Sequence, residues 1–320
     1  SEQQPGAPAA GTAVMQNGAA TVAQIMEVLQ QNGLLAASPA TYSDIRLTGV
    51  SVSANPLPHT LFFVSDPRRM PPQRPGNSVV ICKSVEIAND GGPYITTSHP
   101  RLAFGLAVKA FWAEKVHLGK IHPTSVIHPT AHIDVTASIG PFCVVGAHSS
   151  VGQRTVLSNS VTLGPNVRIG HDCQVRSGTV IGEDGFGVET LEQRSTFRLP
   201  HIGGVIVGNH VNIGSLNSIA SGTVSQTTIA DHVQTDNLVH IAHNVSIGPC
   251  SLLTACVEIS GSARIGSNVW LGPNCSIMNA ISIGDRALVG LGAVVTKSVR
   301  DNEVVAGNPA RFIRWRRENE

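Results

Sequence analysis

Aliphatic residues recur every six positions through most of this chain. A helix requires a hydrophobic period of 3.6 and an ordinary strand a period of 2, so a period of six fits neither. It fits short flat strands joined by turns, with one aliphatic side chain per strand filling the inside of a prism. The pattern therefore predicts a left-handed parallel β-helix of hexapeptide repeats. The first unbroken run is Ile121, Ile127, Ile133, Ile139, Val145, Val151, Leu157, Leu163, Ile169, Val175 and Ile181.

The frame of the repeat breaks twice. The first break covers residues 183–201, after which the frame resumes at Val207, and the second lies near 222–228. From Ile229 to Val295 the frame continues, and only Thr235 departs from the aliphatic set. A loop inserted into a regular coil can carry function without disturbing the core. We therefore expect functional residues near the two breaks.

Small residues accompany the repeat. Glycine often follows the aliphatic residue, as in Ile169-Gly170, and we expect it to relieve crowding and to permit positive φ at the corners. Cys143, Cys173 and Cys275 each lie two positions before an aliphatic residue. They are expected to serve as small hydrophobic side chains in a tight core rather than as catalytic thiols.

The segments outside the repeat predict a second, α/β domain. Residues 21–33 read as a helix with Thr21 as N-cap and Gln24 three residues later, and residues 100–113 read as another helix. Between them lie strand-like runs at 45–52, 60–65 and 78–84. The C-terminal run from Arg311 to Arg317 is interpreted as a short amphipathic helical tail. The expected domains are a disordered tail (1–20), an α/β domain (21–115), the β-helix (116–300) and a C-terminal extension (301–320).

Composition narrows the class of protein. The formal net charge is +1 and 13% of residues are charged, so neither a nucleic-acid surface nor an acidic tail is indicated. The six cysteines form no CxxC pair and no metal-finger spacing, so we expect reduced thiols and no disulfides. No apolar run approaches the ~18 residues of a membrane span, and no leader-like apolar segment occurs near the start. These features favour a soluble protein that is not secreted.

The residues around the second break suggest acid–base chemistry. His240 and His243 flank Ile241, which occupies a core position, so His243 is expected near the following corner. A hydrated imidazole titrates near neutrality and suits removal of a proton from an attacking amine or hydroxyl. The alternative is an ordinary surface histidine, since the chain has thirteen. At the first break, Gly182-Glu183-Asp184-Gly185-Phe186-Gly187 suggests a mobile loop able to close over a ligand.

The α/β domain followed by the coil, this glycine-rich loop, and the run Asp-Asn-x-x-x-Ile-Ala-His-Asn-Val at 236–245 together resemble the UDP-3-O-acylglucosamine N-acyltransferases of lipid A biosynthesis. The resemblance implies transfer of a 3-hydroxyacyl chain, carried on the phosphopantetheine of acyl carrier protein, to the 2-amino group of UDP-3-O-acyl-glucosamine. It also implies a homotrimer, no bound cofactor and no metal. The location implied is the bacterial cytoplasm, or the mitochondrion for an organellar homologue whose transit peptide has been removed.

The resemblance also assigns roles to single residues. His243 matches the general base, with the Asp236 carboxylate expected to orient its ring, and Gly261 matches the residue whose N–H would stabilise an oxyanion. Phe63 matches the aromatic side chain that stacks on uracil. The remaining substrate-binding candidates are Asp66, Asp236, Asn237, His240 and Phe186. Three positions differ from the family pattern: Ala280 replaces a frequent second histidine, Arg69 replaces a second aromatic residue, and Asp66 replaces an asparagine.

Three other functions fit parts of the sequence. An O-acyltransferase of UDP-N-acetylglucosamine shares a His-x-x-His pair, but such enzymes begin their coil almost at once. A zinc-dependent hydratase on the same coil would need three well-placed histidine ligands. A non-catalytic relative that only binds nucleotide sugars would accommodate Ala280.

Overall fold

The computed structural model describes residues 18–88, 90–113, 119–192 and 195–317. The chain divides into two compact units, residues 1–116 and 117–320. Most of the predicted tail, residues 1–17, lies outside the described residues. Its last three residues do not belong to a tail, because Ala20 is 1% exposed and Trp112 Nε1 donates to the Gly18 carbonyl at 3.0 Å. Burial of Ala20 in the core of the first unit is the reason the predicted boundary is wrong there.

The first unit is an α/β domain, as predicted. Its α1 helix (Val22–Gln31) begins with the predicted capping box, in which Thr21 and Gln24 bond to each other's backbone. Its five-stranded sheet runs β2-β7-β6-β5-β4, with all neighbours parallel except β2 and β7. The sequence did not predict β2 (Ala36–Ala37) or β7 (Tyr94–Thr97). The other elements are β1 (Ala20–Thr21), β3 (Arg46–Leu47), β4 (Gly49–Val50), β5 (Thr60–Phe63), β6 (Val79–Cys82), α2 (Pro100–Phe111) and the 3₁₀ turns η1 (Ala40–Tyr42), η2 (Pro67–Arg69) and η3 (Val85–Ala88).

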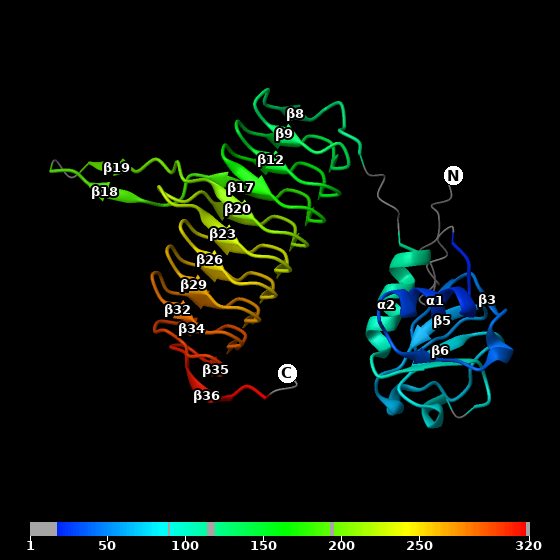
Figure 1. The fold of residues 1–320 in the computed structure, drawn as a ribbon. Helices are drawn as coiled ribbons and strands as arrows, with labels where there is room; N and C mark the ends of the chain where they lie inside the picture. The colour runs from blue at the N-terminus through cyan, green and yellow to red at the C-terminus, as the bar shows by residue number, and fades with distance from the viewer. Residues whose placement is uncertain (1–17, 89, 114–118, 193–194, 318–320) are drawn as a thin grey trace, which may run out of the picture. The chain divides into compact units, whose positions relative to one another are not determined.

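The second unit is a parallel β-helix of three sheets, which confirms the prediction from the six-residue period (Figure 1). We name each sheet by one of its strands. The β25 sheet contains β8 (Val126–Ile127), β11 (Val144–Val145), β14 (Thr162–Leu163), β17 (Val180–Glu183), β22 (Ser218–Ala220), β25 (His240–Ile241), β28 (Glu258–Ile259), β31 (Ser276–Ile277) and β34 (Val294–Val295). The β26 sheet contains β9 (His132–Ile133), β12 (Ser150–Val151), β15 (Val167–Ile169), β20 (Val205–Val207), β23 (Thr227–Ile229), β26 (Ser246–Ile247), β29 (Arg264–Ile265) and β32 (Ser282–Ile283). The β27 sheet contains β10 (Ser138–Ile139), β13 (Val156–Leu157), β16 (Gln174–Val175), β21 (Asn212–Ile213), β24 (Gln234–Thr235), β27 (Leu252–Leu253), β30 (Trp270–Leu271), β33 (Leu288–Val289), β35 (Glu303–Ala306) and β36 (Arg311–Trp315).

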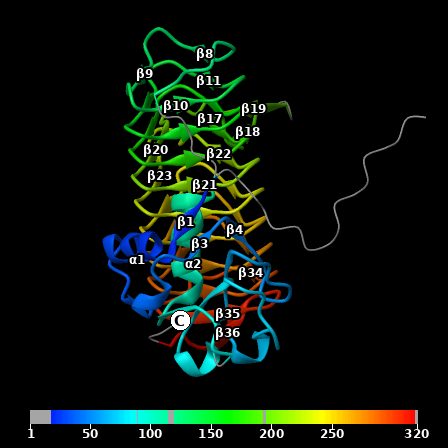
Figure 2. The same ribbon diagram turned by 90° about the vertical axis from the view of Figure 1, so that its right-hand side faces the viewer.

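The coils stack on one another (Figure 2), and residues eighteen apart lie directly above one another in the regular coils. The aliphatic positions therefore form three internal columns. Nearly all of these side chains are buried, and the three cysteines predicted to face inward are at most 2% exposed. Thr235, the polar exception, also points inward, and its Oγ1 accepts from Gly214 N at 3.0 Å and Asn217 Nδ2 at 3.2 Å. The buried hydroxyl is therefore tolerated because it is hydrogen-bonded.

The glycines after the aliphatic residues serve only one of their two predicted purposes. A Cβ on Gly146 would lie 2.7 Å from the Gly164 carbonyl carbon, so these glycines do allow the coils to stack closely. Positive φ falls two residues later, mostly on other residue types such as His148 and Asn166. The prediction that glycine supplies the left-handed corners is therefore wrong in most coils. Coil-to-coil hydrogen bonds hold non-glycine residues there instead, as in the bond from Asn166 N to Ala147 O.

Both predicted interruptions occur at the same edge of the prism, where the β25 sheet leads into the β26 sheet. We call this edge the His243 edge. Between β17 and β20 the chain leaves the coil as a hairpin, β18 (Val188–Thr190) and β19 (Thr196–Arg198), which projects from the stack in Figure 1. Between β22 and β23, residues 221–226 form a shorter loop. Two successive coils are thus opened at one edge, just before the coil that contains His243.

The C-terminal run is a strand rather than the predicted helical tail. β36 pairs antiparallel with β35, the last strand of the coil. An uncovered edge strand presents unpaired backbone N–H and C=O groups. Pairing with that edge satisfies those groups, which a separate helix would leave exposed.

No helix within the described residues is long and apolar enough to cross a membrane. The six cysteines are free, and Cys250 and Cys256 are the exposed ones. Burial raises the pKa of the Cys275 thiol to about 12, which removes it as a nucleophile near neutral pH.

Candidate active site

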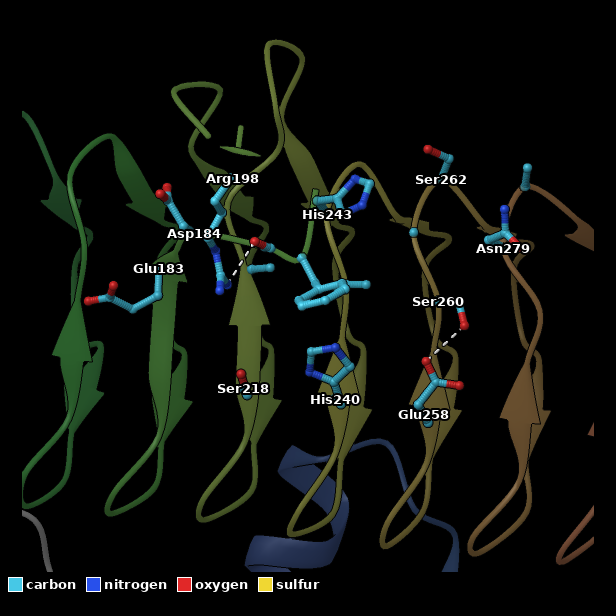
Figure 3. Close-up of a pocket in the computed structure, with 16 residues that line it drawn as sticks. Glu183, Asp184, Arg198, Ser218, His240, His243, Glu258, Ser260, Ser262 and Asn279 are labelled. Carbon is cyan, nitrogen blue, oxygen red and sulfur yellow. Dashed lines mark hydrogen bonds between the residues drawn. The ribbon is translucent and has the colours of Figure 1, made fainter. Parts of the chain in front are cut away.

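A cavity of about 680 Å³ lies along the His243 edge. Its walls come from four neighbouring parts of that edge: the loop at 183–186, His243, Gly261 and Ala280. Figure 3 shows His243 at the corner, with His240 further along the same strand and Glu258 on the next strand. The site is therefore built where the regular repeat has been opened.

One ring nitrogen of His243 is held by a hydrogen bond and the other is unblocked. Its Nδ1 lies 2.9 Å from Oδ1 of Asn244. The amide oxygen is only an acceptor, so Nδ1 carries the hydrogen and Nε2 carries the lone pair of the neutral ring. This tautomer suits proton removal by Nε2.

Asn244 is itself fixed by the shorter inserted loop. Its Nδ2 donates to Ser225 O and Ser225 Oγ, both at 2.9 Å, while its Oδ1 accepts from Thr223 Oγ1 at 3.0 Å. Asp236 makes no such contact, because its Oδ1 accepts from Asn237 N at 2.8 Å on the preceding edge of the prism. Within the chain, the orienting group is therefore Asn244 and not Asp236 as expected.

Gly261 lies against the reactive nitrogen of His243. A Cβ at this position would be 2.7 Å from both Nε2 and Cε1 of His243, so no side chain fits without moving the ring. Within the described part of the chain, the Gly261 N–H has no protein acceptor. A proton acceptor and a vacant backbone donor thus meet at one wall of the cavity.

The loop of the first insertion lines the cavity. Phe186 is 78% exposed, and the Arg198 guanidinium lies 5.6 Å from the centre of its ring. Arg198, from β19, also donates to the Gly185 carbonyl at 3.0 Å. The hairpin therefore supports the glycine-rich loop from one side.

His240 and Glu258 line the floor of the cavity. They occupy paired positions on β25 and β28. Glu258 Oε1 accepts from Ser260 Oγ at 2.9 Å. His240 points outward and is exposed, so the structure brings both members of the predicted histidine pair to one cavity.

Phe63 and Asp66 lie in the first unit. The Phe63 ring is 5.1 Å from that of Phe104 on α2 and is half-buried. The Arg68 guanidinium beside Asp66 lowers the pKa of that carboxyl, and Asp66 also caps η2 by accepting from Arg68 N at 3.1 Å. Both residues are thus engaged in local contacts, which the sequence did not indicate.

Several residues of the site were not singled out from the sequence: Asn244, Arg198, Glu258 and His201, which is 7% exposed and packs beside His243. Arg198 and His201 belong to the insertion, so the first break in the repeat was the signal that pointed to them. Glu258 occupies an outward position that the period itself identifies, but nothing in the sequence distinguished it from other outward residues.

A second histidine group lies on a different edge, where the β26 sheet leads into the β27 sheet. We call it the His210 edge. Ligand atoms of His171, Asp172 and His210 lie within 4.8 Å of one another there. Both oxygens of Asp172 already accept from Arg154, at 2.7 and 2.6 Å, and this ion pair lowers the pKa of Asp172. The arrangement is an ion pair next to stacked rings, away from the cavity.

Known proteins resemble this chain in sequence and in structure. Residues 262–297 match the family model for the bacterial transferase hexapeptide (six repeats). A UDP-3-O-acylglucosamine N-acyltransferase from Caulobacter is 38% identical over 92% of each chain. A probable mitochondrial UDP-3-O-acylglucosamine N-acyltransferase from Arabidopsis thaliana is 36% identical over 47% of this chain, and the match spans about half (49%) of that relative.

Among solved structures, UDP-N-acetylglucosamine O-acyltransferase from Moraxella catarrhalis is 30% identical, with a TM-score of 0.58 over 62% of this chain and 76% of that one. The corresponding enzyme from Francisella novicida is 26% identical, with a TM-score of 0.57 over 61% of this chain and 70% of that one. The match to the Caulobacter protein extends over both the α/β unit and the coil. The chain therefore belongs to the UDP-3-O-acylglucosamine N-acyltransferase family.

Proposed function

We propose that this protein transfers a 3-hydroxyacyl group from acyl carrier protein to the 2-amino group of a UDP-linked, 3-O-acylated glucosamine. The observation that carries the proposal is the placement of His243 Nε2 against Gly261 at one wall of the cavity. The name of the Caulobacter relative, whose match covers both units, supports UDP-3-O-acylglucosamine as the acceptor. The donor rests on the resemblance alone.

The reaction needs one base and one stabiliser of negative charge. The acceptor nitrogen attacks the thioester carbonyl carbon, a C–N bond forms, and His243 Nε2 takes the proton that the nitrogen loses. The carbonyl oxygen becomes an oxyanion, which the vacant Gly261 N–H is placed to stabilise. When the carbonyl re-forms, the C–S bond breaks, and His243 returns its proton to the leaving sulfur of phosphopantetheine.

Direct transfer fits this site better than an acyl-enzyme intermediate. The cavity is lined by no cysteine, and the only hydroxyl groups among its lining residues belong to Ser218, Ser260 and Ser262. Ser260 is engaged with Glu258. The attack is therefore assigned to the acceptor amine, and no bound cofactor is required.

The proposed assembly is a homotrimer. Asp236 and Asn237 lie on the edge where the β27 sheet leads into the β25 sheet, and they do not line the cavity of their own chain. They would reach a cavity only if this edge of one subunit met the His243 edge of another. Packing of prisms in that way would also cover the exposed outward side chains of the β25 sheet, such as Val126 and Val144.

An assay of acyl transfer tests the proposal. The purified protein is incubated with 3-hydroxyacyl-acyl carrier protein and either UDP-3-O-acylglucosamine or UDP-N-acetylglucosamine, and products are identified by mass spectrometry. We expect N-acylation of the first acceptor and no O-acylation of the second. The reverse preference would support the O-acyltransferase activity named for the solved structures, and no transfer to either would contradict the proposal.

Phe63→Ala tests the binding of the nucleotide. Stacking of a base on an aromatic side chain is worth ~1–3 kcal/mol, so we expect UDP-sugar affinity to fall by roughly tenfold or more. Because Phe63 also packs against Phe104, the melting temperature is measured alongside calorimetric binding. Equal affinities for the wild type and a folded variant would remove Phe63 from the binding site.

A further inference from the structure

His201 is a buried histidine with an unpaired nitrogen beside the proposed base. It lies between the projecting hairpin and β20 and is 7% exposed. Its Nδ1 lies 2.9 Å from the carbonyl oxygen of Leu199, so Nδ1 carries the hydrogen. Its Nε2 has no hydrogen-bond partner. Buried polar atoms are nearly always paired, so this one requires an explanation.

The contacts of His201 place it behind the wall of the cavity. Its ring centre is 5.1 Å from that of His243, with the planes 62° apart. A Cβ added to Gly185 would lie 3.0 Å from His201 Nε2, 3.0 Å from His243 Cβ and 3.1 Å from His243 Cδ2. A side chain at Gly185 would therefore press against both histidine side chains, whose rings pack edge-on.

The backbone of His201 also holds the loop that lines the cavity. His201 N donates to Asp184 Oδ1 at 3.1 Å, and the Gly185 carbonyl accepts from Arg198 at 3.0 Å. His201 thus contacts both the loop before Gly185 and the ring of His243, without lining the cavity itself.

We propose that His201 is a positioning residue for acyl transfer, which holds His243 and the loop at Gly185 in the arrangement that the reaction requires. Its Nε2 carries a lone pair in the tautomer selected by Leu199. A lone pair next to His243 favours the positive charge that His243 gains when it takes the proton of the amine. The free nitrogen is therefore kept unpaired for an electrostatic purpose, and a purely packing role would not need it. This inference rests on the proposed function.

The test compares two variants that separate ring shape from polarity. His201→Phe keeps a ring but loses both the bond to Leu199 and the lone pair, whereas His201→Gln keeps a donor and an acceptor. In steady-state acyl transfer we expect His201→Phe to lower kcat roughly tenfold with little change in KM, because small displacements of a catalytic group are costly. His201→Gln should retain kcat within about threefold. His210→Ala, on the other edge, is the matched histidine control and should leave kcat unchanged.

A double-mutant cycle with Gly185 keeps the test decisive if His201→Phe does not fold. Gly185 does not adopt a positive φ, so Gly185→Ala adds only a Cβ between the two imidazoles. Gly185→Ala should lower kcat less in a His201→Ala background than in the wild type, because the new Cβ no longer presses against the imidazole of His201. Additive effects would overturn the inference, as would wild-type kcat in His201→Phe or a loss confined to KM. If the wild type transfers no acyl group, the proposed function itself fails, which is a separate result.

Discussion

The His243 edge and the His210 edge of the prism are both rich in histidine, but their histidines have different surroundings, and the cavity described above lies along the His243 edge. At the His210 edge the repeat is regular, so side chains from successive coils stack on one another. His210 lies parallel to His232, with ring centres 4.8 Å apart, and edge-on to His171 at 4.9 Å. At the His243 edge the two insertions replace these regular neighbours. The ring of His243 therefore has Gly261 and the cavity on one side, and its one ring neighbour, His201, comes from the first insertion rather than from a stacked coil.

The comparison shows that a histidine becomes a candidate base through what surrounds it. In the regular column of the His210 edge, Asp172 is partnered by Arg154 from the preceding coil. At the His243 edge, the two insertions interrupt the column of stacked side chains, so the neighbour from the preceding coil is missing on one side of His243. The shorter loop then supplies a new contact to the far side of the ring, through Asn244. A reactive nitrogen and an orienting bond thus arise from the same interruption.

The largest difference between the two edges is expected when the histidine of each is replaced by alanine. Because loss of a general base costs typically 10²–10⁴-fold, His243→Ala should lower kcat at least ~100-fold with the assembly intact. His210→Ala should leave kcat unchanged, and His240→Ala should fall between, since His240 lines the cavity without contacting Gly261. Steady-state acyl transfer and size-exclusion chromatography are the measurements. Near wild-type turnover in His243→Ala would mean that another group is the base.

Gly261→Val tests whether the open space beside His243 is required. Even the first carbon of the new side chain would lie 2.7 Å from Nε2 and Cε1 of His243. We expect kcat to fall by roughly 10²-fold, comparable to the loss of one oxyanion donor. The melting temperature should change little, because the displaced ring can swing into the cavity. A variant that unfolds without any selective loss of turnover would show that Gly261 serves only the stacking of the coil.

Asn244→Gly tests whether the contact from Asn244 orients His243, because it removes the amide without straining the backbone. Asn244 has φ +62°, a conformation that glycine adopts freely. Loss of the bond to Nδ1 should lower kcat roughly tenfold, as for other groups that orient a catalytic residue. Asn268→Gly is the control, since Asn268 has φ +56° at the His210 edge. Equal rates for both variants would show that the tautomer of His243 is fixed by something else.

The smallest effect is expected at the ion pair of the His210 edge. Asp172 has a lowered pKa because of Arg154 first and His171 second. A lowered pKa in the folded state stabilises the fold above the unfolded value of about 4, and this stabilisation is lost as the pH falls further. Asp172→Asn should therefore cost less than ~1 kcal/mol at neutral pH, because the pair is partly exposed. Thermal denaturation should show the difference shrinking below about pH 4, and a constant difference at every pH would contradict the assignment.

In the first unit, the start of α1 could be predicted from neighbouring residues in the sequence, whereas β7 could not. Thr21 and Gln24 identified the first residues of α1, because a capping box is a property of four consecutive residues. β7 was not predicted, although it is the central neighbour of two strands. Its sequence, Tyr-Ile-Thr-Thr, is short and is preceded by glycines and a proline. Its pairing with β6 and β2, which are distant in sequence, decides that it is a strand.

The sequence by itself determined the β-helix, its inward residues and the places where it is interrupted. This was possible because each strand contributes one side chain to the core, so a period of six appears directly in the chain. Only the tertiary structure decided that both interruptions open the same edge, that within the chain Asn244 rather than Asp236 contacts His243, and that the C-terminal run forms a strand. The first two depend on contacts between coils, such as those that hold Asn244 to Thr223 and Ser225, and the last depends on pairing with β35. No local pattern in the sequence encodes such contacts.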